Sequence, residues 1–158
     1  MTVLVLLRHA KAINRVDWLG EDEDRPLNQL GQEQARRIGS TYSKFDIKKI
    51  YTSDAVRCLD TVKEMSLAFD IELQITKHLS EYINNKKPER AIEYAKEIIY
   101  ADIKEGRNTL ICSHNPVLPR MLDRFLKHAK VKLKENHLRP SESWVLQFEG
   151  KKCIAIEH

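Results

Sequence analysis

Cysteine is scarce in this sequence, and the three that are present, Cys58, Cys112 and Cys153, stand far apart. Their odd number and wide spacing predict neither a set of disulfides nor the paired ligands of a zinc site. Reduced, buried thiols in a cytoplasmic protein are the simplest interpretation. No other pattern of residues requires a metal ion or an organic cofactor, and we expect the protein to use none.

Long apolar runs are also absent, and no stretch approaches the length that crosses a membrane. The first apolar run, at residues 3–7, is too short for the core of a signal peptide. Arg8 stands where such a core would have to continue. We therefore expect a cytoplasmic protein without a membrane partner.

Internal repeats, low-complexity tracts and a large excess of one charge are missing as well. The 158 residues carry a formal net charge of +4, with 42% hydrophobic and 32% charged residues. This length and composition predict a single domain over residues 1–158. The densest basic stretch, residues 127–134, has no interleaved aromatic residues, so we interpret it as solvated and expect no nucleic-acid binding.

What the sequence does contain is an alternation of strand-like apolar runs and amphipathic helical segments. Strands are predicted over residues 3–7, 47–52, 71–75, 108–113, 144–148 and 153–156. Helices are predicted after the capping residues Asn28 and Ser53, from Pro88, and after Asn115. The alternation indicates a three-layer α/β/α sandwich around a mostly parallel central sheet, with the last two strands as a hairpin at one edge.

Polar residues of similar chemistry follow three of the predicted strands. Arg8 and His9 come directly after the first strand, Ser53 and then Arg57 follow the second, and His114 follows the fourth. In an open α/β sheet the carboxyl ends of the strands meet at one crevice, where ligands bind. We therefore expect these side chains to lie close together although they are far apart in the sequence.

Arginines and histidines that meet at one crevice indicate a phosphate site. The planar fork of arginine matches phosphate oxygens, and the helix starts after Ser53 and Asn115 would add backbone N–H donors. A neutral histidine can attack phosphorus and carry the phosphoryl group, while a second histidine donates to its oxygens. Each residue taken alone has a structural alternative, such as a solvated arginine or a core histidine, and their coincidence at three strand ends favours the functional interpretation. His78, His128, His137 and His158 share no such position and are treated as background.

These motifs resemble those of the histidine phosphatase superfamily, also called phosphoglycerate-mutase-like. RHA at residues 8–10 stands where the superfamily has Arg-His-Gly, and SDAVR at residues 53–57 is similar to its Ser-x-x-x-Arg segment. SH at residues 113–114 resembles its later Ser-His step, and RPL at residues 25–27 resembles its loop-to-helix element. The resemblance covers most of the chain, in detail from residue 3 to about residue 120.

The resemblance implies a role for each residue of the crevice. His9 would be the nucleophile that becomes phosphohistidine, and Arg8, Arg57 and His114 would form the phosphate pocket. Glu81, which follows the third predicted strand, is the best candidate for the acid that protonates the leaving group. Its alternative is an exposed loop carboxylate. The chain has no obvious room for the cap segments of larger members, so a minimal, capless fold with an open pocket is implied.

The segment after His9 bears on the substrate. Lys11, Arg15, Trp18 and Gly20, followed by acidic residues and RPL, resemble the SixA-like domains fused to certain Nudix hydrolases. Lys11 and Arg15 could bind a second phosphate or an acidic partner, or could be solvated loop cations. Trp18 either stacks on a base or covers the loop.

The substrate prediction follows from the SixA-like resemblance and the open pocket. We predict a metal-independent protein phosphohistidine phosphatase, with a nucleotide or small-molecule phosphatase as the alternative. A non-catalytic phosphate-binding module is a second alternative. The candidate substrate-binding residues are Lys11, Arg15, Ser53 and Asn115. The sequence makes no prediction of the oligomeric state.

Overall fold

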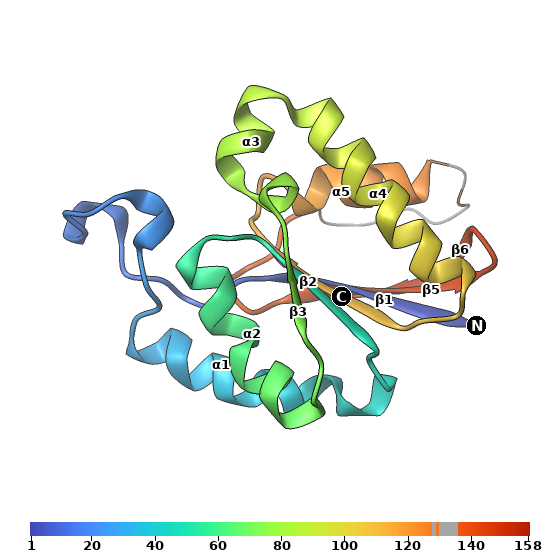
Figure 1. Ribbon diagram of the computed structural model, residues 1–158, viewed down its shortest axis with the longest axis horizontal. Helices are drawn as coiled ribbons and strands as arrows, with labels where there is room; N and C mark the ends of the chain where they lie inside the picture. The colour runs from blue at the N-terminus through green and yellow to red at the C-terminus, as the bar shows by residue number, and fades with distance from the viewer. Residues whose placement is uncertain (128, 130–135) are drawn as a thin grey trace.

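A computed structural model of the protein describes residues 1–127, 129 and 136–158 (Figure 1). The basic stretch at residues 127–134, interpreted above as solvated, lies for the most part outside these described residues, as does His128. The described strands form one six-stranded sheet in the order β3-β2-β4-β1-β5-β6. Their bounds are β1 Thr2–Arg8, β2 Lys49–Thr52, β3 Leu73–Ile75, β4 Thr109–Ser113, β5 Ser143–Glu149 and β6 Lys152–Glu157.

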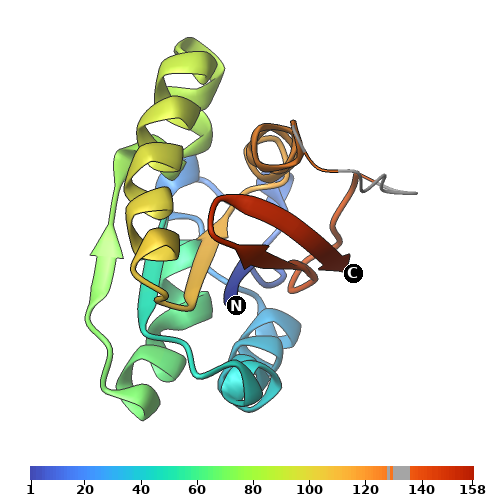
Figure 2. The same cartoon turned by 90° about the vertical axis from the view of Figure 1, so that its right-hand side faces the viewer.

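The sheet is mostly parallel, as predicted. Four adjacent strands run parallel to one another, in the order β1, β4, β2 and β3. Strand β5 lies antiparallel on the other side of β1, and β6 lies antiparallel beside β5. The predicted hairpin of the last two strands is therefore confirmed, and Figure 2 shows it in red facing the viewer. In the parallel register Arg8 pairs with Ser113 and Thr52 with Cys112, so β1, β2 and β4 end at one level. The residues that follow these strands are thereby brought to one edge of the sheet.

Helices cover both faces of the sheet and complete the three predicted layers (Figure 1). Helices α1 (Gln29–Tyr42) and α2 (Val56–Phe69) pack on one face, and α4 (Pro88–Lys104) and α5 (Leu118–Leu126) pack on the other. None of the helices in the described ranges is long and apolar enough to cross a membrane. The shorter helical elements are α3 Glu81–Lys86, η1 Arg15–Asp17, η2 Asp22–Asp24, η3 Ser43–Phe45 and η4 Lys77–Leu79.

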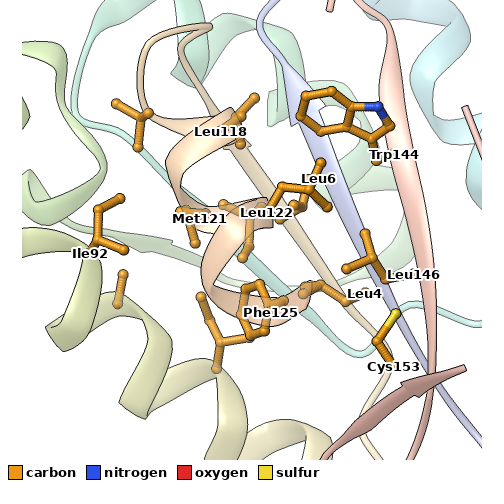
Figure 3. Packing of buried hydrophobic residues seen from close by; sticks show 14 of the residues in the cluster. Leu4, Leu6, Ile92, Leu118, Met121, Leu122, Phe125, Trp144, Leu146 and Cys153 are labelled. Carbon is orange, nitrogen blue, oxygen red and sulfur yellow. The ribbon is translucent and has the colours of Figure 1, made fainter. Parts of the chain in front are cut away.

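The continuous apolar run of β1 is explained by its position between the two helical layers. Leu4 and Leu6 point into the core under α4 and α5, where they lie in one cluster with Trp144 and Phe125 (Figure 3). The alternate residues of β1 belong to the second cluster under α1 and α2. A strand buried on both faces needs apolar residues at every position, and each fully buried leucine contributes about 1.5–3 kcal/mol to stability.

The start of helix α2 differs from the sequence prediction. Ser53 does not cap the helix, because α2 begins at Val56 with Ala55 as its N-cap residue, and no side chain caps it. The Ser53 hydroxyl instead lies 2.9 Å from His114 Nε2 and accepts a hydrogen bond of 3.3 Å from the Ala55 N–H, ahead of the first turn of the helix. Arg57 is therefore the second residue of the helix, and its side chain starts from the helix end nearest the strand termini.

The segment after β3 is helical, so the interpretation of Glu81 as a loop residue is wrong. Ser80 is the N-cap residue of α3, and its hydroxyl accepts a hydrogen bond of 3.1 Å from the Ile83 N–H. Glu81 is the first residue of that helix. A short helix with few apolar positions has no clear periodicity, which is why the sequence did not reveal it.

Candidate active site

The backbone immediately after β1 is fixed by helices α1 and α2. The Ala10 N–H donates to the Thr61 hydroxyl at 2.9 Å, and the Lys11 N–H donates to Gln34 Oε1 at 2.9 Å. Helix α1 approaches so closely that a Cβ atom on Gly31 would lie 1.9 Å from the Lys11 carbonyl oxygen. Only glycine fits there, and the close contact holds the segment that carries His9 in one place.

The His9 side chain is buried, with 7% of its surface exposed. Its Nδ1 atom lies 2.7 Å from the Ala10 carbonyl oxygen, which can only accept a hydrogen bond. The proton is therefore on Nδ1, and the lone pair is on Nε2. Burial lowers the pKa of His9 to about 4, and the charges of His114 and Arg57 act in the same direction. His9 is thus a neutral imidazole near neutral pH, the form that can attack phosphorus.

The second histidine, His114, faces His9 with a ring-centroid distance of 5.4 Å. Its Nδ1 atom lies 3.3 Å from a terminal nitrogen of Arg57. Because a guanidinium can only donate, Nδ1 accepts and the proton lies on Nε2, which donates to the Ser53 hydroxyl at 2.9 Å. Ser53 therefore orients His114 from the side of the ring opposite Arg57.

The Arg57 guanidinium is almost completely buried, with 1% of the residue exposed. It donates to the Asp22 carbonyl oxygen at 2.8 Å and to Glu81 Oε2 at 2.7 Å. The same Glu81 oxygen lies 3.6 Å from His114 Nδ1 and 3.4 Å from a terminal nitrogen of Arg15. One carboxylate oxygen thus sits among several nitrogen atoms, which marks a position suited to an anionic oxygen.

Arg8 lines the same cavity as His9. One terminal nitrogen donates to the Leu138 carbonyl oxygen at 2.7 Å, while its buried Nε atom has no hydrogen-bond partner among the described residues. Burial lowers the pKa of this guanidinium. Asn115 is nearby, where its side chain donates to His137 and accepts a hydrogen bond from the Leu138 N–H. The unused Nε–H of Arg8 is a donor that a bound anion could satisfy.

Two neighbouring cavities open at this edge of the sheet. The smaller, of about 290 Å³, is lined by Arg8, His9, Lys11 and Asn115, among others. The larger, of about 710 Å³, is lined by residues that include Arg57 and His114. Arg15 and Glu81 line both cavities, so their ion pair stands between the two halves of the site. Ser53 is the one predicted site residue that lines neither cavity.

Three residues that shape this site were not predicted from the sequence: Asp22, Thr61 and Gln34. Gln34 follows the RPL segment and Thr61 follows the SDAVR segment, both of which resemble the superfamily, so the sequence offered a signal for these two residues. The sequence offered no such signal for Asp22. It is one of four consecutive acidic residues, and only the folded structure shows which of them contacts Arg57. Its carboxylate lies 3.2 Å from Arg57 and 3.0 Å from Arg25, and so fastens the loop after His9 to the site.

The neutral state of His9 predicts that acid destabilises the protein. The pKa of His9 is lowered from 6.5 to about 4 in the folded protein, so between these values the unfolded chain binds the proton more readily. The contribution of His9 to stability is therefore complete above about pH 6.5 and is lost by about 3 kcal/mol as the pH falls to about 4. Urea unfolding across this range should show that His9→Asn loses less stability on acidification than the wild type. A difference between the two proteins that does not change with pH would contradict this expectation.

The fold and the site together define a class of protein. A mostly parallel α/β sheet whose carboxyl edge gathers two arginines around two histidines is the arrangement of a phosphate-ester hydrolase that uses histidine. The chain belongs to the histidine phosphatase superfamily (branch 1), because residues 4–97 match the sequence model of that family. The predicted superfamily and enzyme class are thereby confirmed, and the alternative of a non-catalytic phosphate-binding module is not retained.

Several known proteins are similar to this chain. The 8-oxo-(d)GTP phosphatase of Mycolicibacterium smegmatis is 27% identical over 159 residues, which cover 99% of this chain and 47% of that protein. The present chain thus spans about half the length of that relative.

Solved structures share the fold over nearly their whole length. The protein histidine phosphatase SixA complexed with tungstate matches with a TM-score of 0.79 at 15% identity, covering 99% of this chain and 95% of that chain. A mycobacterial glucosyl-3-phosphoglycerate phosphatase complexed with VO3 matches with a TM-score of 0.74 at 13% identity, covering 100% of this chain and 98% of that chain. These likenesses confirm the predicted α/β fold.

Proposed function

We propose that this protein is a metal-independent phosphatase that works through a phosphohistidine intermediate on His9. The proposal rests mainly on the position of Glu81 Oε2. This atom lies 2.7 Å from a terminal nitrogen of Arg57 and 3.6 Å from His114 Nδ1. A phosphoryl oxygen in that position would accept the same hydrogen bond from Arg57, and His114 would donate to it in the tautomer with the proton on Nδ1. His9, in the neutral form with its lone pair on Nε2, lies beside it.

In the first step, the Nε2 lone pair of His9 forms the bond to phosphorus. The bond from phosphorus to the leaving group breaks, and its electron pair stays on the leaving atom. Where that atom needs a proton, the Glu81 carboxyl group supplies it. Arg8, Arg57 and His114 stabilise the negative charge on the phosphoryl oxygens during the transfer.

In the second step, water attacks the phosphohistidine. The new bond joins the water oxygen to phosphorus, and the bond between phosphorus and Nε2 breaks. The electron pair returns to Nε2, and the Glu81 carboxylate takes a proton from the water. Inorganic phosphate leaves, and His9 is again neutral.

Two classes of substrate are candidates for this site. A protein phosphohistidine, the first prediction from the sequence, is supported by the open site and by the fold shared with SixA. A nucleotide is supported by the 27% identical relative, which acts on 8-oxo-(d)GTP, and by a cavity that extends past Arg57 to an aromatic side chain, Trp18. Lys11 and Arg15 line the cavity that contains His9 and could bind a second phosphate. We therefore propose a nucleoside diphosphate as the better-supported substrate.

The test is to capture the phosphoenzyme on a protein of residues 1–158, which we propose forms a single domain. In EDTA, the wild type should acquire one acid-labile phosphoryl group from GDP, acetyl phosphate or a phosphohistidine peptide, whichever it uses, and should release phosphate. His9→Ala should lose both the label and the turnover, whereas His158→Ala, outside the site, should keep them. Turnover that survives in His9→Ala, or that EDTA abolishes, would contradict the proposal. Within the residues that the structure describes, no three His, Cys, Asp or Glu side chains are grouped to hold a metal ion.

A further inference from the structure

The cavity beside Arg57 and His114 is larger than a phosphoryl group requires. Its volume of about 710 Å³ is in the range of cavities that hold whole small molecules. Its walls are the loop at residues 18–23 and the start of α3, two segments that project to the same side of the molecule in Figure 1. Trp18 lines the cavity from the loop, and Tyr82 lines it from α3. A ligand whose phosphate reached Arg57 would therefore place its remaining part between two aromatic residues.

The indole of Trp18 is held in a fixed orientation. Its Nε1–H donates to the Glu21 carbonyl oxygen at 2.8 Å. Gly20 packs against the ring so closely that a Cβ atom there would lie 3.0 Å from the indole atoms. An indole fixed by its own loop and lining a cavity is a ready surface for stacking, because little conformational entropy is lost when a planar ring binds.

The rim of the same cavity is acidic. Glu21 and Glu23 line it, and neither carboxylate has an ion pair or a side-chain hydrogen bond among the residues the structure describes. A carboxylate accepts two parallel N–H donors, and the guanine edge presents such a pair in its N1–H and 2-amino groups. Adenine presents an acceptor at N1 beside a single amino group, which a carboxylate would disfavour.

We infer that this cavity is a binding site for a purine base of the guanine type, stacked on Trp18 with its donor edge toward Glu21 or Glu23. The inference rests on the proposed function, because the site at Arg57 must take the phosphate of the same molecule.

Kinetics of substrates with and without a base provide the first test. The ratio of kcat/KM for GDP to that for acetyl phosphate cancels any general effect on the reaction at His9. We expect Trp18→Leu to lower this ratio roughly 5- to 150-fold, the range for loss of one base–aromatic stack. Leu19→Ala is the matched control in the same loop, since Leu19 is 100% exposed and does not line the cavity, and its ratio should equal that of the wild type. An unchanged ratio in Trp18→Leu would overturn the inference while leaving the phosphatase proposal intact.

Fluorescence provides a second test that needs no turnover. In His9→Ala, titration with GMP should quench tryptophan emission, and the quenching should vanish in His9→Ala/Trp18→Phe, because the other tryptophan, Trp144, is fully buried. AMP should bind about 10-fold or more weakly, and inorganic phosphate should not quench. Equal responses to GMP and phosphate, or none to GMP, would overturn the base site. If the wild type forms no phosphoenzyme but GMP still quenches Trp18, the proposed function fails and the base site stands.

Discussion

Replacing Arg57 with alanine is expected to lower kcat/KM for every phosphorylated substrate by about 10³-fold, a typical cost of removing an arginine that stabilises a transferring phosphoryl group. The guanidinium lies at 1% exposure and donates to Glu81 Oε2, in the position proposed for a phosphoryl oxygen. Water could not replace it there without losing the fixed orientation that α2 provides. Steady-state kinetics on GDP and acetyl phosphate measure the effect, and both substrates should lose activity to the same extent.

Two further variants separate charge and fold from the specific role of Arg57. Arg57→Lys keeps the charge but cannot donate in two directions at once, so we expect it to lose about 10²-fold. Arg36→Ala removes an exposed arginine of α1 and should leave kcat/KM unchanged. Arg57→Ala should lose only about 1–2 kcal/mol of stability, because the carboxylates of Asp22 and Glu81 remain partly open to water. Activity within about threefold of the wild type in Arg57→Ala would exclude the proposed pocket.

The part of the site that the sequence predicted is the part that strand topology fixes. Arg8 is the last residue of β1, and His9 and His114 follow β1 and β4, which end at one level. Their proximity therefore follows from the order of the sheet and needs no detail of side-chain packing. Arg57 belongs to the same set because α2 begins at Val56, with only residues 53–55 between it and the end of β2. Residues fixed to the ends of buried strands can therefore be assigned to one site before a structure is known.

The part that the sequence did not predict lies in the loop after β1 and in α3. Which acidic residue of the loop reaches Arg57 depends on the path of the loop, and no periodic pattern encodes that path. The two alternatives for Trp18 stayed open for the same reason. The structure places its ring along the cavity wall, with Gly20 packed against it. Loop conformations arise from particular contacts such as this one, and such contacts are invisible in the sequence alone.

The proposed reaction requires the Glu81 carboxyl group to lie in one position without substrate and in another when substrate is bound. In the described structure its carboxylate occupies the place beside Arg57 and His114 where a phosphoryl oxygen would bind. A bound substrate would displace it from Arg57, and the freed carboxyl group would then face the leaving atom. Glu81 is the first residue of a short helix and lines both cavities, so its side chain lies beside both positions.

Glu81→Gln is expected to affect substrates according to how much their leaving groups need a proton. An alcohol leaving group needs full protonation, so kcat/KM for GMP should fall by about 10²–10⁴-fold. The leaving phosphate of GDP has a pKa of about 6 and needs little help, and a leaving imidazole is similarly undemanding, so losses of only about threefold are expected there. Because kcat/KM reports events up to phosphoenzyme formation, this comparison isolates the first step. Glutamine keeps the size of the side chain and an oxygen that can still accept from Arg57.

Glu89→Gln provides the matched control, because Glu89 lies on the exposed face of α4 and pairs with Arg124 away from the site. It should leave all three substrates unaffected. Equal, large losses on GMP, GDP and a phosphohistidine peptide in Glu81→Gln would contradict the leaving-group role and would instead place Glu81 in binding the phosphoryl group itself. Loss confined to GMP would identify Glu81 as the general acid and would show that the same pocket can release either an alcohol or a phosphate, because only the proton requirement differs between them.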